Sequence, residues 1–326
     1  MSDYKVVITD YLYETVEYEK KVITDAGGSL IPANCKSEDD IIEVAGDAFG
    51  LLVQYAQITE RIMDALKNLR VISRYGVGVD SIDIKAATER GIYVANVTDY
   101  CESEVSDHAL ALLMSCSRKI VAANQYVKGG QWDHTLMKPI ARSSSTVVGL
   151  VGFGQIPRQL AAKLKAIGFQ LLVYDPFVES KDIEKYGAQK VELEQLMVES
   201  DFVSVHAPLN EKTRGLVGAE QLNQMKSSAY LINTARGPVV DEAALIEALQ
   251  SKRIAGAALD VVEQEPIDPN SPLLEMDNVI LTPHMAYYSE ASQVELQIKT
   301  AENVAAVIKG GIPKYLVNRE VLNQGQ

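Results

Sequence analysis

Short apolar runs alternate with longer amphipathic stretches along almost the whole chain. Apolar runs of strand length and stretches with a period near 3.6 residues are the patterns of buried strands and of helices. Because the two alternate, the sequence predicts an α/β protein with doubly wound parallel sheets covered by helices. The strands fall into two sets, so we expect two sheets.

The first set of expected strands covers residues 6–8, 51–53, 71–73 and 93–95. The second set covers residues 146–151, 171–174, 202–205, 230–233, 256–259 and 279–281. Between the sets, apolar residues recur at helical spacing over 104–117, which predicts a long helix that links two domains. A last amphipathic helix is expected over 290–309, returning the chain to the first domain and making that domain discontinuous.

The segment 119–145 interrupts this alternation. It is poorly periodic and contains Gly129, Gly130, Trp132 and Pro139, so we expect an excursion or arm rather than a regular element. Contact with a second copy of the chain is a plausible use for such an arm. We therefore expect a homodimer.

The composition of the chain argues against several classes of function and location. A chain of 326 residues exceeds the usual size of one hydrophobic core, which agrees with two domains. The net charge of -13 argues against a nucleic-acid or anionic-membrane partner, because such surfaces are bound through clustered Lys and Arg. The chain shows no signal-peptide pattern, no apolar run of about 20 residues and three cysteines without metal or redox spacing. We expect a cytoplasmic protein.

A glycine-rich turn follows the strand expected over 146–151. Gly152 and Gly154 permit a tight turn and a close approach of the backbone to a pyrophosphate, whose charge the N-terminus of the next helix stabilises. The following strand ends at Asp175, 21 residues beyond Gly154, where a carboxylate can accept hydrogen bonds from the adenosine ribose. A dinucleotide-binding Rossmann domain is therefore predicted.

Two residues modify this prediction. Pro157 replaces the third glycine of the usual fingerprint; proline is tolerated in the first turn of a helix, but it removes one possible donor to the phosphates. Asp175 would repel the 2′-phosphate of NADP, and Lys181 is the only cation nearby in the sequence. NAD is therefore the expected cofactor, with NADP less favoured.

Six motifs stand in a fixed order along the chain: 73–80 (SRYGVGVD), 152–154 (GFG), 206–209 (HAPL), 233–237 (NTARG), 260–266 (DVVEQEP) and 282–284 (TPH). In this order they resemble the D-isomer-specific 2-hydroxyacid dehydrogenases over nearly the whole chain. With the segment 96–101 (NVTDYC), the resemblance is nearest to phosphoglycerate dehydrogenase-like enzymes and C-terminal-binding-protein corepressors. It implies a flavodoxin-like substrate domain at residues 1–98 plus 290–326 and a Rossmann domain at 99–289.

Three residues carry the expected chemistry. Arg236 follows a strand end, where its planar guanidinium can hold the carboxylate and keto oxygens of a 2-keto acid. His284 would donate a proton to the carbonyl during reduction and accept one during oxidation. Glu265 would pair with His284 and orient its ring. The alternatives without a catalytic role are a surface arginine for Arg236, a buried neutral histidine for His284 and a solvated glutamate for Glu265.

The resemblance also assigns binding residues. It places the cofactor against Gly152, Gly154, Gln155, Ile156, Asp175, His206, Ala207, Pro208, Thr213, Thr234, Ala235 and Asp260. It places the substrate against Arg236 and the loop residues Tyr75, Gly76, Val77 and Gly78, whose backbone N–H groups would face the substrate carboxylate. A turn without a ligand is the alternative for this loop. No metal site is expected, because His108 and His134 lack partners at ligand spacing.

The resulting hypothesis is an NAD-dependent D-2-hydroxyacid dehydrogenase that moves a hydride between nicotinamide and C2 of a small 2-keto or 2-hydroxy acid in the interdomain cleft. An NADH-sensing, corepressor-like binding protein of the same fold is the alternative, since those proteins keep the same three residues. The short length without disordered tails favours the enzyme. A formate- or phosphonate-oxidising relative is a weaker alternative that Glu265 disfavours.

Overall fold

The computed structural model describes residues 4–325, which form two compact units. Unit 1 runs up to residue 101 and resumes at residue 289, and unit 2 is residues 102–288. We expected the chain to change domains after residues 98 and 289; the units change at 101/102 and 288/289. Among residues 4–325, no helix is both long and apolar enough to cross a lipid bilayer.

Unit 1 is built on a five-stranded parallel sheet with the order β2-β1-β3-β4-β5. Its strands are β1 (Tyr4–Ile8), β2 (Gly28–Pro32), β3 (Gly50–Val53), β4 (Val71–Arg74) and β5 (Tyr93–Ala95). This is the flavodoxin-like order, whose switch point lies between β1 and β3. Ligands bind at such a point outside the carboxyl ends of the strands, so the loops after β1, β3 and β4 are the candidate surface of this unit.

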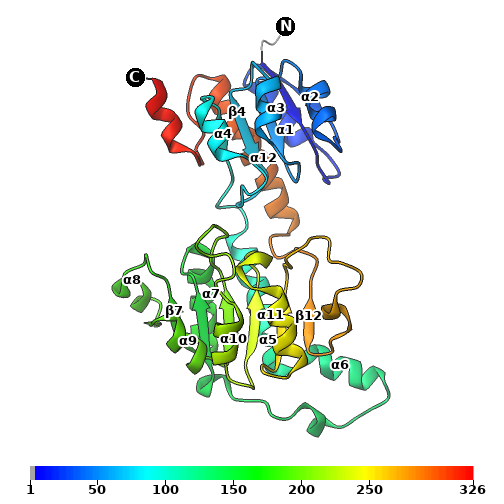
Figure 1. Ribbon diagram of the computed structural model, residues 1–326, viewed down its shortest axis with the longest axis vertical. Coiled ribbons are helices and arrows are strands. Elements are labelled where there is room, and N and C mark those ends of the chain that lie inside the picture. The colour runs from blue at the N-terminus through cyan, green and yellow to red at the C-terminus, as the bar shows by residue number, and fades with distance from the viewer. Residues whose placement is uncertain (1–3, 326) are drawn as a thin grey trace. The chain divides into compact units, whose positions relative to one another are not determined.

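Helices cover both faces of this sheet, which leaves the central strands buried. They are α1 (Glu17–Asp25), α2 (Glu38–Ala45), α3 (Glu60–Ala65), α4 (Ile84–Glu89) and α12 (Glu290–Ile308). One core cluster joins α2, α3 and α4 to the sheet. α1 packs against α12, which also contacts β3 and β4 and runs beside the strands of this unit (Figure 1).

The C-terminal segment of the chain is fastened to unit 1 by polar side chains. Asn318 is buried, accepts the N–H of Val94 at 2.8 Å and donates to the carbonyl of Ile92 at 2.9 Å. A short helix, η5 (Arg319–Gly325), ends the described chain.

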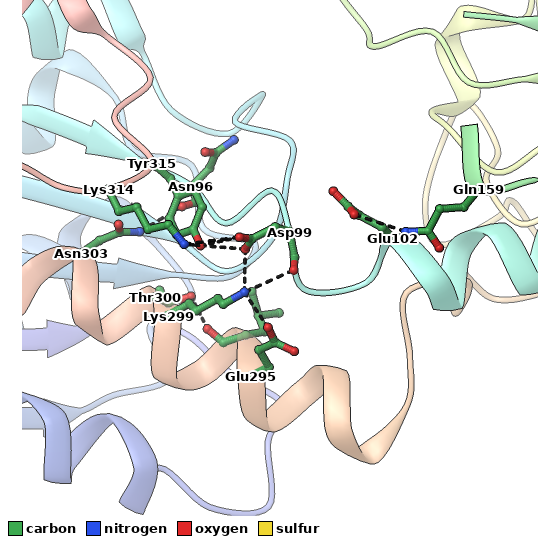
Figure 2. Close-up of polar contacts among 11 residues, drawn as sticks. Asn96, Asp99, Glu102, Gln159, Glu295, Lys299, Thr300, Asn303, Lys314 and Tyr315 are labelled. Atoms are coloured by element: carbon green, nitrogen blue, oxygen red, sulfur yellow. Dashed lines mark hydrogen bonds and ion pairs between the residues drawn. The ribbon is translucent and has the colours of Figure 1, made fainter. Parts of the chain in front are cut away.

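Asp99 lies at the centre of a polar cluster in unit 1 (Figure 2). Its carboxylate accepts hydrogen bonds from Nζ of Lys299 on α12 at 2.7 Å and from the Tyr315 hydroxyl at 2.7 Å. Nζ of Lys314 lies 3.4 Å from the same carboxylate. Lys299 also pairs with Glu295 one turn earlier on α12. The cluster ties the last residues before the first unit boundary to α12 and to the C-terminal segment.

Unit 2 contains a seven-stranded parallel sheet with the order β12-β11-β10-β9-β6-β7-β8. Its strands are β6 (Val147–Val151), β7 (Gln170–Tyr174), β8 (Gln189–Lys190), β9 (Phe202–Val205), β10 (Tyr230–Asn233), β11 (Gly256–Leu259) and β12 (Val279–Leu281). The order reverses between β6 and β9, as it does in a Rossmann sheet. The loops after β6 and β9 therefore flank the expected dinucleotide site.

Two core clusters lie on opposite faces of this sheet. One contains side chains of α5 and α7, and the other contains side chains of α9, α10 and α11. The α-helices of the unit are α5 (Glu102–Arg118), α6 (Ile120–Lys128), α7 (Gln155–Ile167), α8 (Ser180–Glu184), α9 (Leu193–Glu199), α10 (Ala219–Gln224) and α11 (Glu242–Gln250). Its short 3-10 helices are η1 (His134–Met137), η2 (Ser143–Ser145), η3 (Gly237–Val239) and η4 (Pro272–Glu275).

The segment 119–145 contains one regular element that the sequence did not predict. It forms α6, in which no residue is buried, and then η1 and η2 before β6 begins. Within unit 2, α6 and the chain that follows it extend away from the sheet (Figure 1). The sequence did not predict α6 because it is a short helix in a segment that also contains Gly129, Gly130 and Pro139 and is poorly periodic as a whole.

The ten expected strands are present, and two further strands were missed. β2 has the burial pattern of an exposed edge strand, and β8 has only two residues. An edge strand lacks the continuous apolar run of a central parallel strand, so its sequence resembles that of a loop.

The Asp99 cluster generates a pH-dependent prediction. Partial burial favours a higher pKa for Asp99, but hydrogen bonds from Lys299 and Tyr315 and the charges of Lys299 and Lys314 outweigh it, and the pKa falls to about 2. A carboxyl group whose pKa is depressed on folding stabilises the protein above its unfolded pKa and loses that contribution as the pH falls through the folded value.

Asp99→Asn should therefore lower the free energy of unfolding at pH 7 by about 1 kcal/mol, a value that allows for solvent screening of this partly exposed pair. The difference from the parent protein should disappear as the pH falls from about 4 to about 2. Urea denaturation followed by circular dichroism measures both. Asp25→Asn, which removes the exposed Lys21 pair, is the control and should have little effect; a constant Asp99→Asn deficit at all pH values would contradict the prediction.

Candidate active site

The glycine turn after β6 has the geometry that the sequence predicted. Gly152 has φ of +93°, and a Cβ at this position would lie 3.0 Å from the backbone N of Ala207 and 3.0 Å from the carbonyl carbon of His206. Only glycine fits there without strain. At Gly154 a Cβ would meet nothing within 4 Å, so open space lies in front of this residue.

Gly154 is the N-cap of α7 and provides no side-chain cap. The first backbone N–H groups of a helix lack intrahelical acceptors, so those of Gln155 and Ile156 can face an anion. Pro157 is buried at the third helical position, where its missing N–H has no acceptor within the helix. The substitution of glycine by Pro157 thus removes one donor without interrupting α7.

Asp175 lies beside this turn. One carboxylate oxygen accepts the N–H of Phe153 at 2.8 Å, and the other accepts the N–H groups of Phe177 at 2.8 Å and Val178 at 3.2 Å. A carboxylate has about four lone-pair sites, so it can also accept from a ribose hydroxyl. Asp175 therefore fixes the glycine turn and remains suitable for the role predicted for it.

The loop after β9 carries further predicted cofactor residues. His206 bonds Ser204 Oγ through Nε2 at 2.8 Å, and burial of the ring lowers the pKa of His206 to about 4. His206 is therefore neutral at pH 7 and suits a structural role beneath the glycine turn. The Thr213 hydroxyl donates to the Pro208 carbonyl and accepts the N–H of Asn210 at 2.9 Å, which holds the loop in place.

Arg236 is presented by a turn that Asn233 organises. The Asn233 side chain accepts the N–H of Ala235 at 3.0 Å and donates to the carbonyl of Arg236 at 3.0 Å. A Cβ at Gly237 would overlap the carbonyl of Val262, so this glycine lets the Arg236 turn pack against the segment that leads to Glu265. The positive charge of Arg236 also contributes to lowering the pKa of Glu265.

His284 and Glu265 form a direct pair. Nδ1 of His284 lies 2.6 Å from Oε2 of Glu265, and each side chain is 37% exposed. Burial acts to raise the pKa of Glu265, but the hydrogen bond and charge of His284, the N–H of Val262 and the charge of Arg236 together lower it. Glu265 is therefore a carboxylate at neutral pH.

The backbone at His284 is held in an unusual conformation. Its φ is +51°, in the left-handed region that non-glycine residues seldom adopt. The N–H of His284 bonds the carbonyl of Asp260 at 2.8 Å, and the Asp260 carboxylate accepts the N–H groups of Met285 at 3.0 Å and Ala286 at 2.9 Å. These bonds fix the turn that directs the imidazole toward Glu265.

Asp260 itself is almost wholly buried, with 2% of its surface exposed. It also accepts the Thr282 hydroxyl at 2.6 Å, and Nε2 of His108 lies 3.0 Å from that same hydroxyl. The structure thus gives Asp260 a role in shaping the His284 turn. The contact with the cofactor that the resemblance implies for Asp260 stays a prediction.

Sequence reasoning missed three of these supporting residues. Asn233, Thr282 and His108 hold the turns that present Arg236 and His284. An Asn at the end of a strand is a recognisable turn signal. His108 offered no such signal, because its partner lies 174 positions away in the sequence.

In unit 1, the predicted substrate loop follows β4 and begins with a buried residue. Tyr75 is 2% exposed and its side chain points inward, whereas Val77 is 39% exposed. Gly76 has φ of +120°, and a Cβ there would overlap the Arg74 guanidinium. The positive φ favours glycine at this position, and a larger residue would also require the Arg74 side chain to move.

The orientation of the peptide groups in this loop follows from two hydrogen bonds. The carbonyl of Gly76 accepts the N–H of Val97 at 3.0 Å, and the carbonyl of Val77 accepts Nδ2 of Asn96 at 2.6 Å. In a trans peptide the C=O and N–H point in opposite directions. The N–H groups of Val77 and Gly78 therefore both point away from the segment 96–97, an arrangement that suits an anion.

A neighbouring loop of unit 1 is fixed by a residue that the sequence did not single out. Asp10 is 8% exposed, and its carboxylate accepts the N–H groups of Gln54 at 3.2 Å, Tyr55 at 2.6 Å and Ala56 at 3.2 Å. It therefore ties the loop after β1 to the loop after β3, at the switch point of the sheet.

Within unit 2 the structure brings the predicted residues into two groups. The glycine turn lies against Ala207 and the Asp175 carboxylate, and His284 pairs with Glu265 next to the Arg236 turn. The loop 75–78 belongs to unit 1. Residues 4–325 contain no cluster of three or more His, Cys, Asp or Glu side chains that could hold a metal ion.

Comparison with known proteins identifies the family. The model described as D-isomer specific 2-hydroxyacid dehydrogenase, NAD binding domain, matches residues 110–286. The chain belongs to the D-isomer-specific 2-hydroxyacid dehydrogenase family. It is 44% identical over 269 residues to a glyoxylate reductase of Korarchaeum cryptofilum, covering 81% of each chain.

A glyoxylate reductase of Thermofilum pendens is 39% identical over 325 residues, 94% of this chain and 95% of the relative. A D-3-phosphoglycerate dehydrogenase of Archaeoglobus fulgidus is 40% identical, but the chain spans only 50% of its length. Among solved structures, a D-lactate dehydrogenase of Aquifex aeolicus complexed with NAD and lactic acid has a TM-score of 0.87 and 28% identity, covering 96% of this chain and 99% of that one.

The predicted family, the two α/β domains and the activity class of an NAD-dependent D-2-hydroxyacid dehydrogenase are confirmed. Relatives such as these carry enzyme names, and the corepressor alternative finds no support among them.

The residues of unit 2 fit a bound dinucleotide. The open space at Gly154 and the uncapped N-terminus of α7 provide room and N–H donors for a pyrophosphate. In addition, the buried hydroxyl of Thr234 makes no hydrogen bond within residues 4–325. A buried hydroxyl without a partner at the carboxyl edge of the sheet is consistent with a ligand nearby.

The packing at Gly237 can be tested directly. Gly237→Ala places a methyl group against the Val262 carbonyl, so the Arg236 turn and the Glu265 segment must separate. We expect a loss of about 1–3 kcal/mol in stability and at least a tenfold fall in kcat/KM, because the reacting groups are displaced. Thermal denaturation and steady-state kinetics measure the two effects.

Gly129→Ala is the matched control, since its Cβ would meet its neighbours at 3.4 Å and its φ is negative. This control should change neither quantity appreciably. Full activity of Gly237→Ala would show that Arg236 and Glu265 do not depend on this close approach.

Proposed function

We propose that the protein uses NADH to reduce a small 2-keto acid, with glyoxylate as the first candidate, and that it oxidises the corresponding 2-hydroxy acid in reverse. The His284–Glu265 contact of 2.6 Å beside the Arg236 turn carries this proposal. The names of the curated relatives, glyoxylate reductases among them, support the choice of substrate. Unit 1 is proposed as the substrate domain and unit 2 as the cofactor domain.

The cofactor would be held by the glycine turn, the first N–H groups of α7 and the carboxylate of Asp175. Gly152, Gly154, Gln155 and Ile156 face the pyrophosphate in this proposal, and Asp175 accepts from the adenosine ribose. The carboxylate of Asp175 also disfavours the 2′-phosphate of NADP. When bound, NADH supplies the hydride that the carbonyl carbon of the substrate accepts.

The residues of the chain bind the acid and move the proton. The Arg236 guanidinium holds the substrate carboxylate and keto oxygen in a fixed fork. Nδ1 of His284 is engaged by Glu265, so Nε2 is the nitrogen that donates a proton to the carbonyl oxygen as the alkoxide forms. The negative charge of Glu265 stabilises the protonated ring before transfer and holds the remaining proton on Nδ1 afterwards.

The loop 75–78 supplies the second contact to the substrate carboxylate in this proposal. Its consecutive N–H groups at Val77 and Gly78 point in a common direction, and Val77 is exposed. Two backbone donors at a glycine-rich turn form the kind of concavity that binds carboxylates.

Turnover is tested with NADH and a panel of glyoxylate, hydroxypyruvate, pyruvate and one bulkier 2-keto acid. His284→Ala should lower turnover by about 10²–10⁴-fold, because proton transfer to the carbonyl is lost, and it should leave NADH affinity nearly unchanged.

Asp175→Ala should chiefly weaken NADH binding and reduce the preference for NADH over NADPH. NADH oxidation and fluorescence titration measure the two properties; the reverse pattern, or tight NADH binding without turnover on any acid, would refute the assignment.

We also propose a homodimer that forms through the arm at residues 119–145. Large apolar side chains of this arm are exposed, including Ile120 at 58%, Val127 at 47% and Trp132 at 89%. An exposed apolar surface of this kind marks an interaction site, and closed symmetric dimers are the commonest assembly.

A cytoplasmic location is proposed as well, because the number and spacing of the cysteines do not suit a disulfide framework.

Light scattering coupled to gel filtration tests the dimer. The parent protein should have twice the mass of one chain, and Trp132→Glu should shift the population toward the monomer because it places a charge in an apolar contact. Phe177→Glu, at an equally exposed position outside the arm (87% exposed), should leave the mass unchanged. A monomeric parent protein, or equal behaviour of the two variants, would exclude the arm as the dimer contact.

A further inference from the structure

A buried carboxylate lies behind the substrate loop of unit 1. Glu19 on α1 has no exposed surface, and its Oε1 accepts the hydroxyl of Tyr75 at 2.9 Å. Nε2 of Gln297 on α12 donates to the same carboxylate at 3.0 and 3.1 Å. Removing a carboxylate from water is costly unless hydrogen bonds compensate, so this position calls for an explanation beyond helix packing.

The orientation of Gln297 is fixed by a third contact. Its Nε2 also donates to the carbonyl of Thr15 at 2.7 Å, and a carbonyl can only accept. The amide nitrogen therefore faces Glu19, so Gln297, Tyr75 and the backbone N–H of Glu19 itself all donate to the carboxylate. Burial raises the pKa of Glu19, and the bonds from Gln297 and Tyr75 act against that rise.

Tyr75 is the first residue of the loop, and its whole side chain is directed into the unit. The ring packs edge to face on Tyr13 with centroids 5.2 Å apart, and the backbone N–H bonds the Val53 carbonyl at 2.9 Å. The next residues include Gly76 and Gly78, whose backbones have little intrinsic stiffness. The bond from Tyr75 to Glu19 thus anchors the start of a flexible loop.

The far side of the loop is anchored by Asn96. Its Nδ2 bonds the Val77 carbonyl, while its own carbonyl accepts Nδ2 of Asn303 on α12 at 2.9 Å. Figure 2 shows Asn303 on α12 together with Asn96. Gln297 and Asn303 are each 1% exposed, so α12 directs buried polar side chains toward the supports of both ends of the loop.

We propose that Glu19 and Asn96 are positioning residues for the substrate loop 75–78, with Gln297 and Asn303 of α12 holding them in place. Glu19 fixes the start of the loop through the Tyr75 hydroxyl. Asn96 fixes the peptide group that directs the Gly78 N–H outward. The inference rests on the proposed function of the loop in binding the substrate carboxylate.

Substitutions that remove the hydrogen bonds of Glu19, Tyr75 or Asn96 should weaken substrate binding more than they slow the chemical step. Glu19→Gln sets an amide N–H₂ against that of Gln297, and Tyr75→Phe removes only the hydroxyl while keeping the contact with Tyr13. Each should raise KM for the 2-keto acid on the order of tenfold, with kcat changed less than about twofold and NADH affinity preserved. The effects of the two substitutions on KM should be less than additive in the double variant, because Glu19, Tyr75 and Gln297 belong to one hydrogen-bond network.

Asn96→Asp should raise KM similarly, since it replaces the N–H donor to Val77 by a carboxylate oxygen. Glu17→Gln, on the same helix as Glu19 but exposed, is the matched control and should leave KM unchanged. Hydrogen exchange of the peptide covering 75–78 provides a readout that does not need activity. Exchange there should be faster in Glu19→Gln, Tyr75→Phe and Asn96→Asp than in the control.

The outcomes separate this inference from the proposed function. A parent enzyme that turns over the acid, with variants whose KM and loop exchange are unchanged, overturns the inference and leaves the function intact. Lower melting temperature without a KM change, or a fall in kcat alone, overturns it as well. If the parent protein turns over none of the acids, the proposed function fails, and the exchange rates of the loop decide whether Glu19 and Asn96 position it.

Discussion

Carboxylates placed directly beyond strand ends hold the loops of both sheets in shape. Asp175 follows β7, Asp260 follows β11, and Asp10 stands two positions after β1. Each accepts backbone N–H groups from the loop after another strand. Loops at the carboxyl edge of a parallel sheet have left the sheet ladder, so their N–H groups need other acceptors. A carboxylate is the strongest acceptor available, and it can serve several donors at once.

This constraint changes how two of the expected ligand contacts are understood. Asp175 and Asp260 were predicted to bind the cofactor, and both carboxylates are engaged by the protein's own backbone. Asp260 holds the turn that keeps His284 at φ of +51°, so its loss would move the imidazole whatever it does for the nicotinamide. A residue at such a strand end can therefore be essential for the site without touching a ligand, and substitutions there affect geometry before they affect binding.

The sequence predicted those features that depend on local pattern. Central strands such as β9 and β10 were placed within a residue because they are continuous apolar runs, and the His284–Glu265 pair was expected from the family's motif order. The exposed edge strand β2 was missed because it lacks the continuous apolar run of a central strand. The helix α6 was missed because it is short and lies in a segment with two glycines and a proline, which is poorly periodic as a whole.

The buried polar residues that support the substrate loop could not be predicted from the sequence, for a different reason. Glu19 and Gln297 are 278 positions apart, and Asn96 and Asn303 are separated by 207. A buried Glu on a short amphipathic helix looks in the sequence like any solvated charge, because its partners Tyr75 and Gln297 lie far from it along the chain and Gln297 belongs to α12. Because the cost of burying such groups is offset only in the folded unit, their hydrogen bonds make the loop after β4 depend on the end of the chain. The geometry of a glycine loop at residue 76 is thus set by a helix that begins at residue 290.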